Sequence, residues 1–244
     1  MDAGALLVSM RQLPLGLRLT DRAVFASFLP GRNAEALAHA RGVAAGEVRG
    51  VTWVCGAGGV GKTHLLQAIC AASAQRVRAG YLPLSRVAAL GVGMLEGLAQ
   101  LQCVCLDDVD RLAGEPGWER ALFGLLREAE EAGGTLIVSA PAPPALLPWA
   151  LADLGSRFMA AAVLQLRPLD EAEQQAALQL RARLRGIELP DETWQWLRRR
   201  YPRDMRLLYE LLDTLDEASL TAQRRLTVPF IRDVLLRSAA QPPA

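Results

Sequence analysis

The sequence predicts an α/β fold with a parallel sheet, followed by an all-α domain of four helices. Three observations carry this prediction. Short β-prone runs alternate with helical runs through the first two thirds of the 244 residues, and a glycine-rich motif stands between the first such strand and its helix. After Pro168 the chain shows helical periodicity only. Such alternation is typical of parallel sheets that are covered by helices on both faces.

The strands are predicted from short apolar runs that end at turn-forming residues. A helix should follow each of the first three strands, the third of these helices at 118–132, and the folded body should begin near Phe25. The predicted strands span residues 51–55, 79–84, 103–106, 135–140 and 162–166.

Helix-breaking residues divide the region after Pro168 into the four predicted helices. The breaks lie at Gly186, Pro190, Pro202 and Pro229. Asp170 is a predicted N-cap, with Glu173 three residues later as in a capping box. Thr227 should open the last helix, because a proline follows in its first turn.

The strongest local signal is a G-x-x-x-x-G-K-T motif between the first predicted strand and the helix after it. Glycines let the backbone turn tightly and aim its N–H groups at phosphate oxygens. Lys62, the only lysine in the chain, would neutralise the β- and γ-phosphates, and Thr63 would offer its hydroxyl to Mg²⁺. The motif predicts a nucleoside phosphate site; the alternative is a chance glycine-rich turn. Its residues are Gly56, Ala57, Gly58, Gly59, Val60, Gly61, Lys62 and Thr63.

The strand predicted at 103–106 ends in two acids, Asp107 and Asp108, as a Walker B element does. Ligands of open α/β sheets bind at the carboxyl ends of the strands. We predict that Asp107 holds Mg²⁺, directly or through water. Asp108 is a candidate catalytic residue that would polarise the attacking water if hydrolysis occurs in this chain. The alternative is an acidic turn without a chemical role.

Composition excludes some classes of function. The 27 basic and 26 acidic residues give a net charge of +1, so bulk charge does not indicate DNA binding. No stretch reaches transmembrane length, and the start of the chain lacks the basic residues of a signal peptide. We therefore expect a cytoplasmic protein with no membrane partner. Its four cysteines should be free thiols in a reducing compartment: Cys55, Cys70, Cys103 and Cys105.

Two arginines complete a set of motifs. Arg157 lies in Ser-Arg-Phe just before the last predicted strand, and Arg206 opens the third helix of the helical domain. Singly, each would be read as an ordinary solvated or ion-paired arginine. In this order with the phosphate loop and Walker B, they resemble the AAA+ ATPases, specifically the DnaA branch. Within that branch, the runs at 25–31, 177–186 and 219–227 are similar to the Hda-like regulatory inactivators.

The resemblance covers about residue 25 to the C-terminus and implies a site for ADP (or ATP) with Mg²⁺. Leu29, Pro30 and Gly31 would border the adenine, and residues 56–63 would hold the phosphates, with His64 directly after them. Arg206 would be a lid arginine near the β-phosphate. The implied domains are a flexible arm at 1–20, an AAA+ nucleotide-binding domain at 21–168 and a helical lid at 169–244.

Arg157 would then be an arginine finger that acts in trans on the γ-phosphate of a neighbouring subunit. In Hda-like proteins that neighbour is ATP-bound DnaA, so the resemblance implies a negative regulator of replication initiation that promotes hydrolysis of DnaA-bound ATP. One position departs from the family pattern: Pro141, soon after Ser139, stands where an aspartate is typical. We therefore expect only weak hydrolysis of the chain's own nucleotide.

The N-terminal arm resembles the peptide with which Hda-like proteins bind the DNA sliding clamp, the β subunit of DNA polymerase III. Pro14 and Gly16 disfavour a helix and leave an extended peptide. The alternative is a disordered tail without a role. The residues that would contact the clamp are Gln12, Leu13, Leu15 and Leu17.

Other readings remain open at this point. An autonomous ATPase, such as a helicase loader, would use Lys62, Thr63 and the two Walker B acids for its own turnover, and a non-catalytic adaptor would not need Arg157. We expect no sequence-specific DNA binding, because no room for a helix-turn-helix module follows the fourth helix. The arginines at 198–200 are read as a solvated helix face. A homodimer that buries the finger is a further possibility.

Overall fold

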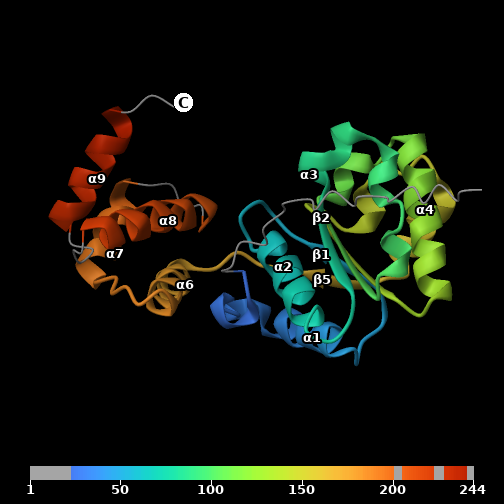
Figure 1. Ribbon diagram of the computed structural model, residues 1–244, viewed down its shortest axis with the longest axis horizontal. Helices are drawn as coiled ribbons and strands as arrows, with labels where there is room; N and C mark the ends of the chain where they lie inside the picture. The colour runs from blue at the N-terminus through green and yellow to red at the C-terminus, as the bar shows by residue number, and fades with distance from the viewer. Residues whose placement is uncertain (1–22, 201–204, 223–227, 241–244) are drawn as a thin grey trace, which may run out of the picture.

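The computed structural model describes residues 23–200, 205–222 and 228–240. They form a five-stranded parallel sheet with helices on both faces, followed by a separate group of four helices (Figure 1). The predicted fold class is confirmed. The predicted clamp-binding peptide at 12–17 lies outside the described residues.

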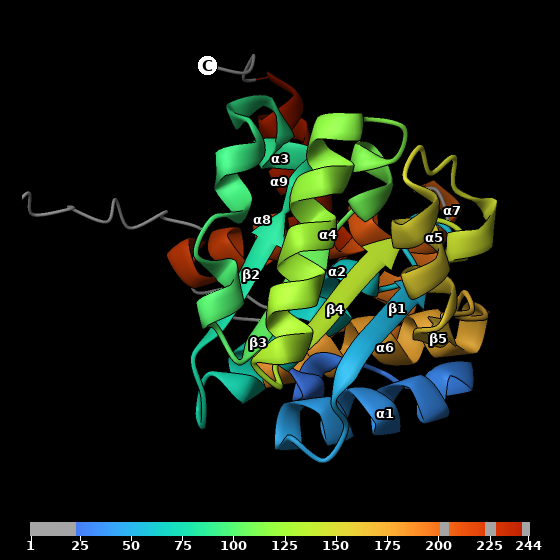
Figure 2. The ribbon, with the colours of Figure 1, turned by 90° about the vertical axis from the view of Figure 1, so that its right-hand side faces the viewer.

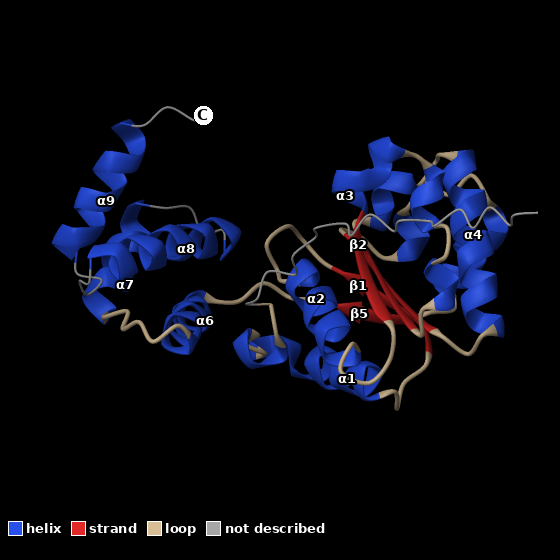
Figure 3. Cartoon of the chain, viewed as in Figure 1, coloured by secondary structure: helices blue, strands red, loops and turns tan. Residues whose placement is uncertain are grey.

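The sheet has the strand order β2-β3-β4-β1-β5, and every neighbouring pair is parallel. Figure 3 shows the strands in red, with α2 on one side of the sheet and α4 on the other. Every residue of the two central strands β3 and β4 is buried, which explains their continuous apolar sequences. Because Cys103 and Gly50 both pair with Thr135, the carboxyl ends of β1, β3 and β4 meet at one edge. The strands are β1 Gly50–Cys55, β2 Ala79–Pro83, β3 Cys103–Asp107, β4 Thr135–Ala140 and β5 Ala162–Gln165.

Alternate side chains along β1 to β4 pack into two apolar cores, one on each face of the sheet. Trp53 packs with α4 and α5, which span Pro116–Glu131 and Ala152–Met159. Its neighbour Val54 packs on the other face with α1 and α2, which span Ala34–Ala45 and Lys62–Ser73. Figure 2 shows α4 lying across the face of the sheet opposite to α2. The sheet is thereby fixed between two helical layers.

The segment after β2 differs from the predicted single helix. The helix α3 covers only Leu84–Val87, and three short 3₁₀ turns follow before β3. Gly91 and Gly97 interrupt the helical path of this segment, because their φ values of 94° and 75° lie outside the helical region. The helix predicted at 118–132 is α4, whereas the sequence analysis did not anticipate α1 and α5.

The four C-terminal helices have a core of their own. Leu178, Trp194, Leu212 and Ile231 are buried within it. The predicted cap of the first helix is confirmed: the Asp170 carboxylate accepts from the Glu173 N–H, and the Glu173 carboxylate accepts from the Asp170 N–H. Thr227 lies outside the described residues. The helices are α6 Glu171–Leu184, α7 Asp191–Arg200, α8 Met205–Ala222 and α9 Val228–Ala240.

The connection between sheet and helical domain is held by the buried amide of Asn33. This side chain donates to the Arg167 carbonyl at 2.9 Å and accepts from the Arg167 N–H at 2.7 Å. One step earlier, the Leu166 N–H donates to the Cys55 carbonyl at 2.7 Å. The chain therefore enters α6 from a fixed point beside the end of β1. No helix among the described residues is long and apolar enough to cross a membrane.

Glu119 on α4 is fully buried and holds the segment that leads into α5. Its carboxylate accepts the backbone N–H groups of Gly114 at 2.7 Å, Ala150 at 3.0 Å and Leu151 at 2.6 Å. A buried carboxylate destabilises a fold unless its charge is hydrogen-bonded, and here three N–H groups supply those bonds.

We predict that Glu119→Ala lowers the free energy of unfolding by about 3 kcal/mol, because three hydrogen bonds to a buried carboxylate are lost. Urea unfolding followed by circular dichroism measures this loss. The matched control is Glu128→Ala on the exposed side of the same helix, which should cost less than about 0.5 kcal/mol. Equal effects of the two substitutions would contradict this role of Glu119.

Candidate nucleotide-binding site

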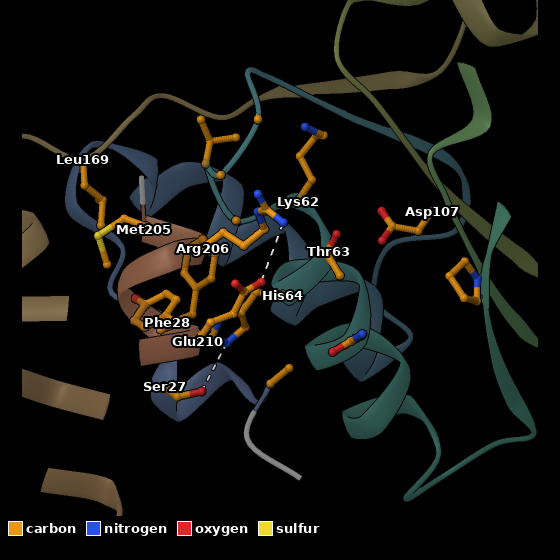
Figure 4. A pocket seen from close by; sticks show the side chains of 18 of the residues that line it. Ser27, Phe28, Lys62, Thr63, His64, Asp107, Leu169, Met205, Arg206 and Glu210 are labelled. Carbon is orange, nitrogen blue, oxygen red and sulfur yellow. Dashed lines mark hydrogen bonds and ion pairs between the residues drawn. The ribbon is translucent and has the colours of Figure 1, made fainter. Parts of the chain in front are cut away.

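A cavity of about 890 Å³ lies between the phosphate loop, the ends of β2 and β3, the turn at Phe25–Ser27 and the helices α6 and α8. Both domains therefore contribute to its wall. Figure 4 shows Lys62 and Thr63 on one side, Met205, Arg206 and Glu210 of α8 on another, and Asp107 at the sheet edge.

The phosphate loop adopts the backbone that its glycines predict. Gly56, Gly59 and Gly61 have φ values of 149°, 76° and 105°, which side-chain-bearing residues rarely adopt. At Gly56 a Cβ atom would also lie 2.6 Å from the Leu166 carbonyl oxygen. The Lys62 ammonium folds over this loop and donates to the carbonyls of Gly56, at 2.7 Å, and Ala57, at 3.1 Å.

The start of α2 suits an anion. The helix begins at Lys62, so its first N–H groups and the positive end of its dipole face the loop. Thr63, in the first turn, is exposed. A glycine cradle, a flexible ammonium and a helix N-terminus together fit a di- or triphosphate.

The Walker B carboxylate of Asp107 stands at the sheet edge with an exposure of 2%. Its Oδ2 accepts from the Tyr81 hydroxyl on β2 at 2.8 Å, and its Oδ1 accepts from the Ser139 hydroxyl on β4. Burial, with Asp107 beside it, raises the pKa of Tyr81, so this hydroxyl stays a donor. The hydroxyl of Ser139 in turn accepts from the Asp108 N–H at 3.0 Å.

Asp108 is the one non-glycine residue with positive φ in the part of the chain that the structure describes, at 62°. Such a conformation in a residue beside a binding cavity is typical of functional sites. It directs the chain away from the sheet immediately after Asp107, and the side chain of Asp108 lines the cavity.

Mg²⁺ fits this arrangement as an ion that comes with the phosphates. Thr63 and Asp107 line the same cavity and supply a hydroxyl and a carboxylate, which are hard oxygen ligands. The described residues contain no group of three or more His, Cys, Asp or Glu side chains that could hold a metal by itself. Magnesium in phosphate sites usually needs only one or two protein ligands, because phosphates and water complete its shell.

His64, directly after the loop, ties the first described residues to α2. Its Nε2 lies 3.1 Å from both the Val24 carbonyl and the Ser27 hydroxyl, so this nitrogen carries the proton. The ring packs edge to face against Phe28, with 5.4 Å between centroids. Burial lowers the pKa of His64 to about 4, and the charge of Arg181 acts in the same direction.

Two arginines enter the cavity from the helical domain. Arg206 on α8 lies 3.7 Å from Glu210 one turn later. Arg181 on α6, with an exposed fraction of 11%, lies over the Tyr209 ring at 4.3 Å and 3.9 Å from Asp213. Both acids, Glu210 and Asp213, also line the cavity, so its helical side carries two arginines that are each paired with a carboxylate.

The structure brings most of the predicted nucleotide residues into one wall. Pro30, Gly31, Gly56 and Ala57 lie outside this lining; a Cβ atom on Gly31 would instead meet the Glu173 carboxylate at the junction with α6. The predicted residues that line the cavity are Leu29, Gly58, Gly59, Val60, Gly61, Lys62, Thr63, His64, Asp107, Asp108 and Arg206.

Arg157 does not line this cavity. It lies on α5, where it is ion-paired with Glu130 of α4 and its guanidinium carbon is 5.3 Å from the centroid of Phe123. The exposed fraction of its side chain is 39%, whereas the next residue, Phe158, is fully buried. The buried neighbour anchors the helix, and the guanidinium remains accessible from outside.

Comparisons with known proteins agree with this geometry. Residues 170–235 match the family model described as Hda, lid domain. The helical domain therefore resembles an Hda lid, and the fold of the chain is similar to that of solved DnaA structures. Domain III of the DnaA replication initiation protein from Thermotoga maritima is similar with a TM-score of 0.75 and 24% identity, over 89% of this chain and 97% of that one.

Two longer DnaA structures also match. AMPPCP-bound DnaA from Aquifex aeolicus is 20% identical with a TM-score of 0.68, over 83% of this chain and 67% of that one. The replication initiator DnaA bound to AMPPCP and single-stranded DNA is 20% identical with a TM-score of 0.65, over 80% of this chain and 65% of that one. This chain thus spans about two thirds of these longer proteins.

Tyr81, Arg181 and Tyr209 are among the polar side chains of the site that the sequence analysis missed. Tyr81 reads as an ordinary strand residue, because tyrosine favours β-structure. Arg181 had a weak signal, since it lies seven residues after Gln174 and both face the cavity from α6. The helical domain thus contributes a second arginine that motif spacing did not single out.

We predict that His64 makes stability fall as the pH drops below about 6.5. Its pKa is lowered to about 4 in the folded protein, so the unfolded chain binds the proton more readily, and acid favours unfolding. Between pH 7.5 and pH 5 this amounts to about 2 kcal/mol.

Urea unfolding of the wild type and of His64→Gln at the two pH values tests this. Between pH 7.5 and pH 5, the free energy of unfolding should fall by about 2 kcal/mol less in His64→Gln than in the wild type. His39→Gln removes the chain's other imidazole and is the matched control. A wild-type pH dependence in His64→Gln would contradict the assignment.

Proposed function

We propose that this protein is an ADP-bound AAA+ regulator that completes the active site of a neighbouring, ATP-bound DnaA and so acts as a negative regulator of replication initiation. The observation that carries the proposal is the position of Arg157. It stands accessible on α5, outside the nucleotide cavity of its own chain. An arginine placed in this way can stabilise the negative charge of a γ-phosphate that another subunit binds.

The identity of the partner is supported by the Hda lid match at 170–235 and the DnaA-type fold. The nucleotide is supported by the cavity and by the AMPPCP that two similar DnaA structures bind. We propose ADP with Mg²⁺ as the resting ligand, a cytoplasmic location, and a tether to the DNA sliding clamp through Gln12, Leu13, Leu15 and Leu17 of the arm.

An autonomous ATPase that acts as a helicase or replication-protein loader is the second candidate. One observation favours it: Lys62, Thr63, Asp107 and Asp108 all line the cavity in cis. It requires substantial turnover by the purified chain alone, whereas the regulator requires a partner. ATP hydrolysis with and without clamp and ATP-bound DnaA separates the two.

We predict that Arg157→Ala lowers the stimulation of DnaA-bound ATP hydrolysis about 10³-fold, because the guanidinium that stabilises transition-state charge is lost. Single-turnover hydrolysis of labelled ATP on DnaA, in the presence of DNA-loaded clamp, measures this rate. ADP binding by the variant should be unchanged, since Arg157 does not line the cavity.

Arg127→Ala is the matched control, because Arg127 is a surface arginine of α4 that pairs with Glu131 one turn later. It should stimulate hydrolysis as the wild type does. If Arg157→Ala stimulates hydrolysis as strongly as the wild type, Arg157 is not an arginine finger. The non-catalytic adaptor and the autonomous ATPase would then be the remaining candidate functions.

A further inference from the structure

Tyr81 reaches the Walker B carboxylate from a neighbouring strand. In the parallel register of β2 and β3, Tyr81 pairs with Cys105 and Pro83 pairs with Asp107. The Tyr81 hydroxyl therefore spans two positions along the strands to reach Asp107 Oδ2 at 2.8 Å. Tyr81, Asp107 and Thr63 line the same cavity.

Asp107 is tied on both of its oxygens. Ser139 donates to Oδ1 from the other side, so one carboxylate joins β2, β3 and β4 at the edge of the sheet. With 2% exposure, Asp107 needs such donors, because a buried charge is costly unless it is hydrogen-bonded. The two hydroxyls also fix the direction in which the carboxylate can face.

This arrangement limits what Asp107 can offer to a cation. A carboxylate has about four lone-pair sites, and two of them point at the hydroxyls of Tyr81 and Ser139. Magnesium or its bound water would have to share the remaining sites of a carboxylate that cannot turn freely. The phosphate loop and Arg206, by contrast, could donate hydrogen bonds to phosphates without any metal.

We propose that Tyr81 is a positioning residue that restrains Asp107 and reduces its share in Mg²⁺ binding, so that the protein holds ADP almost independently of Mg²⁺. The proposal rests on the proposed function, since it explains how a regulator keeps its nucleotide without turning over ATP at a useful rate. It concerns the chain's own cavity and is independent of Arg157.

The test compares the dissociation constant of fluorescent N-methylanthraniloyl-ADP in excess EDTA with that in millimolar Mg²⁺. For the wild type the two constants should be similar. Tyr81→Phe removes only the hydroxyl and should raise the ratio of the EDTA to the Mg²⁺ constant about tenfold, because one hydrogen bond to the carboxylate is released for the cation. The constant in EDTA should not change.

Ser139→Ala removes the other hydroxyl and should shift the ratio in the same direction, which keeps the proposal testable if Tyr81→Phe does not fold. Thr214→Val is the control: it removes an exposed hydroxyl of α8 that does not line the cavity and should keep the wild-type ratio. An unchanged or lower ratio in Tyr81→Phe overturns the proposal.

That result would leave the proposed function standing, because the function is tested by Arg157→Ala with DnaA. Conversely, if wild-type protein binds no ADP in either condition, the proposed function fails as well.

Discussion

The backbone contact between the phosphate loop and Leu166 is the constraint on which the rest of the structure depends. The Leu166 N–H donates to the carbonyl of Cys55, the last residue of β1, and its carbonyl lies so close to Gly56 that no side chain fits there. The same few atoms therefore fix the end of β1, the start of the loop and the path of the chain toward the lid. Asn33 holds the next residue, Arg167, so the lid begins from a rigid point.

From that point the two domains share one cavity. The sheet side supplies the loop, the helix N-terminus and the Walker B carboxylate, and the lid supplies Arg181 and Arg206. On the sheet side, His64 holds the turn at Val24 and Ser27 against α2, and the charge of Arg181 from the helical domain helps to lower its pKa. A nucleotide here would contact groups from both domains, so binding should stabilise their relative position.

The motifs predicted the fold well because each is a local consequence of physics. The glycine spacing, the apolar runs of β1, β3 and β4, and the cap at Asp170 need no knowledge of distant residues. Helix α1 was missed because alanines such as Ala36 and Ala40 fill its buried face and leave little hydrophobic contrast. Tyr81 and Arg181 could not be predicted as site residues, because strand register and the docking of the lid bring them to the cavity.

The packing also keeps the position of Arg157 independent of the nucleotide cavity. On the α4 side of the sheet, Glu119 fixes the entry into α5 and Phe158 is fully buried, so the helix that carries Arg157 is rigid. Neither anchor depends on residues of the cavity. The ion pair with Glu130 joins two half-exposed groups and is therefore weak in water, so in the proposed function a phosphate on another subunit would be able to compete for the guanidinium. If Arg157 acts on a partner as proposed, an anchored helix with an exchangeable ion pair would present the guanidinium with little loss of conformational entropy, whatever the state of the chain's own cavity.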